Sequence, residues 1–179
     1  MRAYLSQFKG KETVSPAPYP KLSEAAVSGL GGLILISLLA LIHFNWGALD
    51  IFFLPFGASA VLAFGAPAAP FSQPRNIIGG HFLAATVGFI VFNIFDHSAW
   101  WVLGLANGLA IAVMVATKTV HPPAGATSLA PAVSGITNPM WLLRPVLAGA
   151  VVIVLVALIY NNVWGRMGRE ARKYPAFWV

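Results

Sequence analysis

The chain of 179 residues contains no cysteine, and only 9% of its residues are charged. The lack of cysteine excludes disulfide bonds, thiolate catalysis and cysteine-ligated metals. An ordinary soluble domain has about 25% charged residues, so this composition excludes that class. Only five residues are acidic, and the two within the apolar region, Asp50 and Asp96, lie at expected loop edges. A cation pathway that uses an intramembrane carboxylate is therefore disfavoured.

Hydrophobic residues make up 58% of the chain, which predicts an all-α, multi-pass protein of the lipid bilayer in a single bundle. The net charge is +6, but the eleven Lys and Arg residues cluster mostly near the termini, without the interleaved aromatics of a nucleic-acid-binding face. We therefore expect no nucleic-acid partner. Residues 1–24 hold no apolar core of the length of a signal peptide, so we expect a polar cytoplasmic N-terminal tail there.

The apolar pattern predicts a transmembrane domain over residues 25–165, followed by a basic cytoplasmic tail over residues 166–179. Six membrane segments are expected, of which the second and the fifth are broken or short. The fifth has only twelve residues, roughly 18 Å as a helix, so it either re-enters the membrane or is half of a span completed by residues 134–140. The six segments are residues 25–44, 51–69, 77–95, 98–117, 122–133 and 145–164.

The positions of the basic residues favour six crossings over four spans with two re-entrant loops. Both arrangements put the two basic termini on one side, which the positive-inside rule makes cytoplasmic. With six crossings, Arg75 and Lys118 are also cytoplasmic and only Arg144 lies outside. With four spans, all three would lie outside, so six crossings fit the rule better.

A short motif occurs twice: Pro-x-Gly-Ala-Ser over residues 55–59 and Pro-x-Gly-Ala-Thr over residues 123–127, 68 positions apart. Beyond each copy comes an arginine beside a proline, at Arg75 and Arg144. We interpret the pattern as two inverted repeats of three segments, about residues 25–95 and 98–164, as in many transporters. The alternative is that prolines and small residues recur by chance in apolar sequence.

Each motif predicts a half-helix that begins inside the bilayer and directs unpaired N–H groups at a ligand. Two such ends facing each other near the midplane would form an anion site, with hydroxyl groups and nearby basic side chains as further donors. Glycine in each motif allows close backbone approach. The candidate substrate-binding residues are Gly57, Ala58, Ser59, Arg75, Lys118, His121, Gly125, Ala126, Thr127 and Arg144.

Several of the polar side chains also have simpler interpretations. His121 either caps the carbonyl end of the preceding helix or contacts the anion and couples it to protons. Lys118 either extends to the interface or binds the anion, and Arg75 either binds lipid headgroups or acts in the site. For His81 and Asn107 we expect hydrogen bonds between helices.

Two stretches resemble the signatures of the HPP family of integral membrane proteins. One is Lys-Thr-Val-His-Pro-Pro-Ala-Gly-Ala-Thr over residues 118–127, and the other extends over residues 57–62, 64–67 and 73–81. The resemblance covers about residues 22–165. It implies a small membrane protein of the bacterial, cyanobacterial-type plasma membrane or of the chloroplast envelope, linked to nitrite transport. The family is often described with four spans, which differs from the six crossings expected here.

The leading hypothesis is a carrier or channel for a small inorganic anion, with nitrite implied by the resemblance. The alternatives are a membrane scaffold or assembly subunit that transports nothing and an anion channel of other selectivity. We expect no enzyme, metal or cofactor, because the spans show no metal cluster, carboxylate pair or Ser/His/Asp set. Glycines 29, 31 and 32 in the first span suggest a homodimer.

Overall fold

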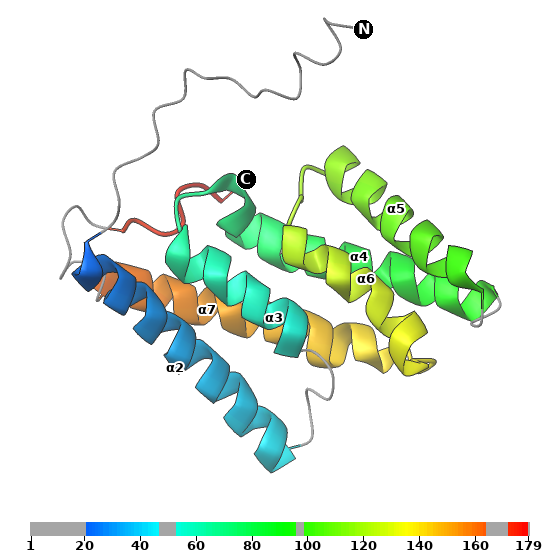
Figure 1. Cartoon of the computed structure of the whole chain (residues 1–179), viewed down its shortest axis with the longest axis horizontal. Coiled ribbons are helices and arrows are strands. Elements are labelled where there is room, and N and C mark those ends of the chain that lie inside the picture. The colour runs from blue at the N-terminus through cyan, green and yellow to red at the C-terminus, as the bar shows by residue number, and fades with distance from the viewer. Residues whose placement is uncertain (1–20, 47–52, 96–98, 164–171, 179) are drawn as a thin grey trace, which may run out of the picture.

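The computed structural model describes residues 21–46, 53–95, 99–163 and 172–178. Every regular element in this part of the chain is a helix (Figure 1), as the apolar pattern predicts. The predictions for Asp50, Asp96 and most of both tails concern residues outside these ranges. The six α-helices are α2 (Leu22–Trp46), α3 (Phe53–Ala60), α4 (Pro74–Ile94), α5 (Trp100–Ala116), α6 (Pro122–Ser134) and α7 (Ala148–Val163).

The helices correspond in number and order to the six expected segments. Three stretches are long and apolar enough to cross a bilayer: Leu22–Asn45, Pro74–Ile94 and Leu142–Val163. Two shorter apolar helices are Leu54–Gly65 and Trp100–Ala116. The described residues therefore confirm an all-helical, multi-pass membrane protein.

The second segment is broken, as its prolines and glycines predict. Helix α3 passes into a π-helical turn, η2 (Val61–Gly65), and a 3₁₀ turn, η3 (Pro70–Ser72), comes before α4. The buried Ser72 hydroxyl donates to the carbonyls of Ala66 (2.7 Å) and Leu62 (3.0 Å). The same two oxygens also accept from the backbone amides of Ala66 and Ala69, so Ser72 adds a side-chain bond to carbonyls that are already paired within the break.

Helix α6 is short because the residues at its two ends start and stop the helix within a few turns. Pro122 and Pro123 occupy its first turn, where proline is tolerated. Gly135 ends it in the left-handed conformation (φ 63°). Residues 136–138 are not helical, so the predicted segment over 134–140 does not continue α6. A second π-helical turn, η4 (Leu142–Leu147), leads into α7 and is kinked at Arg144 (φ −131°, ψ 109°).

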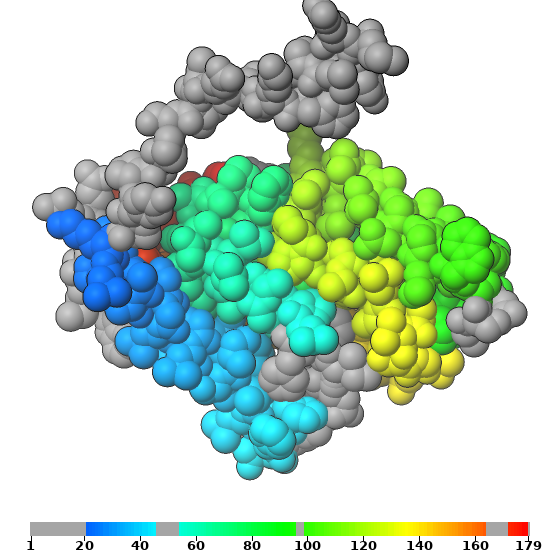
Figure 2. Space-filling view, viewed as in Figure 1, coloured from blue at the N-terminus to red at the C-terminus, as the bar shows by residue number. Residues whose placement is uncertain are grey.

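Helix α4 is the central element and contacts α5, α6 and α7. Glycines allow the helices to approach closely at several points. A Cβ added to Gly149 of α7 would lie 2.2 Å from the ring of Phe56, which is why α3 packs tightly on α7. Figure 2 shows α2, α3, α6 and α5 across one face, with α3 and α6 meeting near its middle.

The C-terminal segment 172–178 packs back onto the broken second element. The Arg172 guanidinium donates to the Phe64 carbonyl (2.9 Å) and to the Ser28 hydroxyl (2.9 Å). The buried Tyr174 hydroxyl donates to the Ser72 carbonyl (2.8 Å). The carbonyls at the end of the break are thus capped by residues far away in the sequence.

Candidate functional site

Four polar side chains form a continuous hydrogen-bonded chain in the interior of the bundle. Ser59 Oγ lies 2.9 Å from Nε2 of His81 and 2.8 Å from Nε2 of His121. Nδ1 of His81 lies 2.8 Å from Oγ1 of Thr127, and Nδ1 of His121 lies 2.7 Å from the carbonyl oxygen of Phe71. All four side chains have a relative exposure of 0%. We call Ser59, His81, His121 and Thr127 the Ser–His network.

The Phe71 carbonyl fixes the direction of every bond in the network when both imidazoles are neutral. A carbonyl oxygen only accepts, so Nδ1 of His121 carries the proton and Nε2 accepts from the Ser59 hydroxyl. Ser59 then accepts from Nε2–H of His81. Nδ1 of His81 therefore accepts from the Thr127 hydroxyl. Each donor therefore points the same way along the chain, from the Thr127 hydroxyl to the Phe71 carbonyl.

Close packing of α4 against α6 positions the two histidines. A Cβ on Gly80 would lie 2.7 Å from the His121 Cβ, and one on Gly88 would lie 2.1 Å from the Ser128 carbonyl oxygen. Both distances are shorter than real contacts, so only glycine allows this approach. The His81 ring also packs edge-on against Phe56, with ring centroids 5.2 Å apart.

A cavity of about 440 Å³ is open to the surface between α5 and α6, and its lining residues Ile111 and Val115 are 49% and 60% exposed. His121 contributes to its wall, as do Gly125 and Ala126 of the second motif. Asn107 of α5 also faces it and donates to the Gly125 carbonyl (3.0 Å). Apolar side chains complete the lining: Ile111, Met114, Val115, Val120, Pro122 and Leu129. A small polar solute fits this volume, and His121 links it to the buried network.

The predicted pair of opposed helix ends is not formed. Helices α3 and α6 pack side by side in opposite directions (Figure 1), so the first turn of α6 lies beside Ser59 and not beside the start of α3. Pro122 and Pro123 have no N–H, and the Ala124 amide donates to the His121 carbonyl (2.8 Å). These first three positions of α6 therefore offer no free amide to an anion.

The structure brings together Ser59, Thr127 and His121 of the candidate residues, with Gly125 and Ala126 beside them. Gly57 instead lies on a groove along α2, and Ala58 is exposed. The Arg75 guanidinium donates to the Thr117 carbonyl (2.8 Å), at the end of α5. Lys118 and Arg144 are exposed, and Arg144 lines a separate cavity of about 60 Å³.

His81 is the member of the network that the sequence did not place in the site. The expected hydrogen bonds between helices are confirmed, since His81 bonds to α3 and α6 and Asn107 bonds to α6. His121 does not cap α5, because its Nδ1 bonds to Phe71. The signal that would have revealed His81 is a histidine within an otherwise apolar span.

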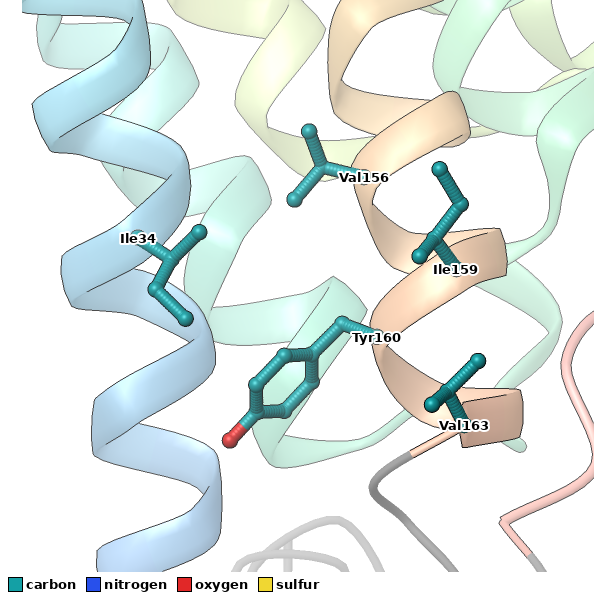
Figure 3. Close-up of a pocket in the computed structure, with 5 residues that line it drawn as sticks. All are labelled: Ile34, Val156, Ile159, Tyr160 and Val163. Carbon is teal, nitrogen blue, oxygen red and sulfur yellow. The ribbon is translucent and has the colours of Figure 1, made fainter.

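A groove of about 360 Å³ between α2 and α7 has a different character (Figure 3). Its lining is aliphatic apart from Tyr160, whose hydroxyl points to α2 and donates to the Val27 carbonyl (2.6 Å). Such a surface suits hydrocarbon and offers nothing to an ion. The other lining residues are Ile34, Val156, Ile159 and Val163.

The fold and the network together define a multi-pass helical membrane protein with a polar centre between two broken elements. Residues 17–175 match the family model of the HPP transmembrane region, and the chain belongs to that family. No solved structure matches the chain.

Two curated relatives are transmembrane proteins of Dictyostelium discoideum. They are 36% and 40% identical to the chain over 187 and 186 residues, and each alignment covers 98% of the chain. The chain spans 63% and 57% of their lengths. Because these relatives come from a eukaryote, the similarity does not point specifically to a cyanobacterial membrane.

Proposed function

We propose that the protein transports a small inorganic anion across the membrane, with nitrite as the substrate that the family resemblance suggests. The Ser–His network is the observation that carries the proposal. Polar side chains inside a membrane bundle are costly and typically mark a transport or proton path. Four of them join the two Pro-x-Gly-Ala motifs here, through Ser59 and Thr127.

The cavity beside His121 is the proposed substrate site. It is reached by Asn107, whose amide is a hydrogen-bond donor, and by His121. Gly125 leaves the space open, because a Cβ there would lie 3.4 Å from the Asn107 amide nitrogen. Both Asn107 amide hydrogens are bonded in the structure, to the Gly125 carbonyl (3.0 Å) and the Ser128 hydroxyl (3.3 Å), so the anion would take the place of one of these acceptors in exchange for part of its hydration. No chemical conversion of the substrate is part of the proposal.

The contacts between helices support the inverted repeat that this mechanism uses. Helix α2 packs on α3 as α5 packs on α6, and α3 packs on α7 as α6 packs on α4. Exchanging the two halves of the chain therefore preserves the contact pattern. We infer that one half tilts against the other around the Ser–His network to alternate access.

Nitrite uptake into proteoliposomes tests the proposal. We expect Gly125→Val, which fills the cavity, to reduce uptake at least tenfold. Gly104→Val is the matched control, because nothing lies within 4 Å of a Cβ at that helical glycine. We expect it to keep most of the wild-type rate. Uptake by folded Gly125→Val equal to that of Gly104→Val would contradict the proposed site.

A second candidate function is a scaffold or assembly subunit, which a groove along α2 and α3 favours. This groove has a volume of about 330 Å³ and is lined by Gly29, Gly32, Gly57 and Gly65 among others. Small residues of this kind allow another helix, including that of a second copy, to pack closely. Absence of flux for every anion, together with a stoichiometric copurifying membrane partner, would favour this function over transport.

A further inference from the structure

We propose that the pair Ser59 and His121 is a binding site for one proton, which is carried together with the anion. This inference rests on the proposed function and names the coupling ion of the same site. The observation that supports it is a second acceptor for the Ser59 hydroxyl. The hydroxyl lies 3.0 Å from the carbonyl oxygen of Pro55, one turn earlier in α3, as well as 2.8 Å from His121 Nε2.

In the neutral network the Ser59 hydroxyl has one proton and two possible acceptors. Nε2 of His121 needs it, because Nδ1–H of the same ring is committed to the Phe71 carbonyl. Ser59 therefore donates to His121, and the Pro55 carbonyl is the unused alternative. The Ser59 hydroxyl oxygen meanwhile accepts from Nε2–H of His81.

Arrival of one proton leaves every group in the network paired. The proton bonds to Nε2 of His121, and the Ser59 hydroxyl turns away to donate to Pro55. Nε2–H of His121 then donates to the Ser59 oxygen, which accepts from both histidines, while Nδ1–H still donates to Phe71. No other proton moves, and the network gains one positive charge. Both states thus use the same atoms, with only one hydroxyl rotated.

The groups around His121 determine what can balance the positive charge that the added proton brings. The groups that face His121 are Ser59 from α3, His81 from α4 and the Phe71 carbonyl. Thr127 of α6 is reached through His81. Among the described residues the only acidic side chain is Glu24, in the first turn of α2, so no carboxylate of this part of the chain joins the network.

An anion in the adjoining cavity is therefore the natural counter-charge for protonated His121. The first three positions of α6 offer no free amide, so the proton supplies the positive charge that the helix end does not. Binding of the proton and of the anion must then strengthen each other by the same factor. Proton and anion together are neutral, which also lowers the cost of crossing hydrocarbon.

Nitrogen NMR of purified wild-type protein labelled with ¹⁵N-histidine tests the proton site without any transport assay. We expect His121 with its neutral proton on Nδ1 and His81 with its proton on Nε2. On acidification His121 should become the charged ring first, while His81 stays neutral. Single His→Gln variants assign the signals, and His43 of α2 is an internal reference.

A neutral His121 with its proton on Nε2 would overturn the proposal. Protonation of His81 before His121 would do the same. Loss of folded signals before His121 becomes charged would also overturn it. Ser59→Ala removes the oxygen that accepts from protonated His121, and we expect the proton affinity of His121 to fall roughly tenfold. Thr86→Val is the matched control, since its hydroxyl bonds only within α4, to Phe82.

A second experiment separates failure of the coupling from failure of the anion transport. Proteoliposomes loaded with a pH-sensitive dye receive external nitrite, and protein-free liposomes correct for nitrous acid that crosses lipid unaided. We expect one proton to enter with each nitrite and Ser59→Ala to weaken this coupling. Nitrite flux with no accompanying proton refutes the coupling alone. The expected NMR result without nitrite flux retains the proton site and refutes the anion as its partner.

Discussion

The close approach of α4 and α6 at Gly88 gives a sharp test of how the site is held together. In Gly88→Ala the new Cβ would lie 2.1 Å from the Ser128 carbonyl oxygen, whereas real Cβ contacts are essentially never under 3.0 Å. The helices must therefore separate by about 1 Å, because backbone cannot turn aside as a flexible side chain does. That separation stretches the 2.8 Å bond between His81 and Thr127 beyond hydrogen-bonding range.

The expected cost has two parts. Overpacking of a tight contact costs about 1–3 kcal/mol, and the lost hydrogen bond costs about 1 kcal/mol more. The total of about 2–4 kcal/mol lowers the ratio of folded to unfolded protein on the order of a hundredfold. Gly104→Ala is the control, since its Cβ meets nothing within 4 Å and should stabilise helix α5 by about 0.5–1 kcal/mol.

The assay is reversible unfolding in mixed detergent micelles, with denaturing detergent added stepwise and tryptophan fluorescence as the signal. Both variants are measured beside the wild type at the same protein and detergent concentrations. The reasoning is refuted when Gly88→Ala unfolds at the same denaturant content as Gly104→Ala. The same result would mean that α4 and α6 do not depend on glycine for their approach.

Three further predictions concern single bonds. Thr127→Val removes the donor to the buried His81 and should cost about 1–3 kcal/mol in the same unfolding assay, whereas Thr127→Ser should cost much less. Arg172→Ala should cost about 1 kcal/mol, because this half-exposed side chain bonds the Phe64 carbonyl. Burial raises the pKa of Tyr174, so its contribution is complete below about pH 10 and is lost as the pH rises further. Tyr174→Phe should remove this alkaline loss of stability, which unfolding measured against pH will show.

The sequence was informative wherever a covalent property fixes the backbone. Proline and glycine marked the break after α3 and the short α6, because neither residue supports an uninterrupted apolar helix. The repeated motif contains Ser59 and Thr127, and the structure places these two side chains on helices that contact the same histidine. These predictions depend only on residue type and spacing, which the amino-acid sequence gives directly.

The relative direction of α3 and α6 could not be predicted from residue type and spacing. Two half-helices with the same motif can meet end to end or lie side by side, and apolar periodicity does not choose between them. The choice depends on α4, where Gly80 and Gly88 admit α6 closely. The resulting packing places His81 between the two motifs, where it bonds both Ser59 and Thr127 in the Ser–His network.

The capping of the broken element by Arg172 has a consequence for biosynthesis. The Phe64 carbonyl finds its guanidinium partner 108 residues later in the chain. This backbone group can therefore acquire its guanidinium partner only after residues 65–172 have been synthesised. A chain that has been synthesised only as far as residue 171 lacks the guanidinium partner of this carbonyl oxygen.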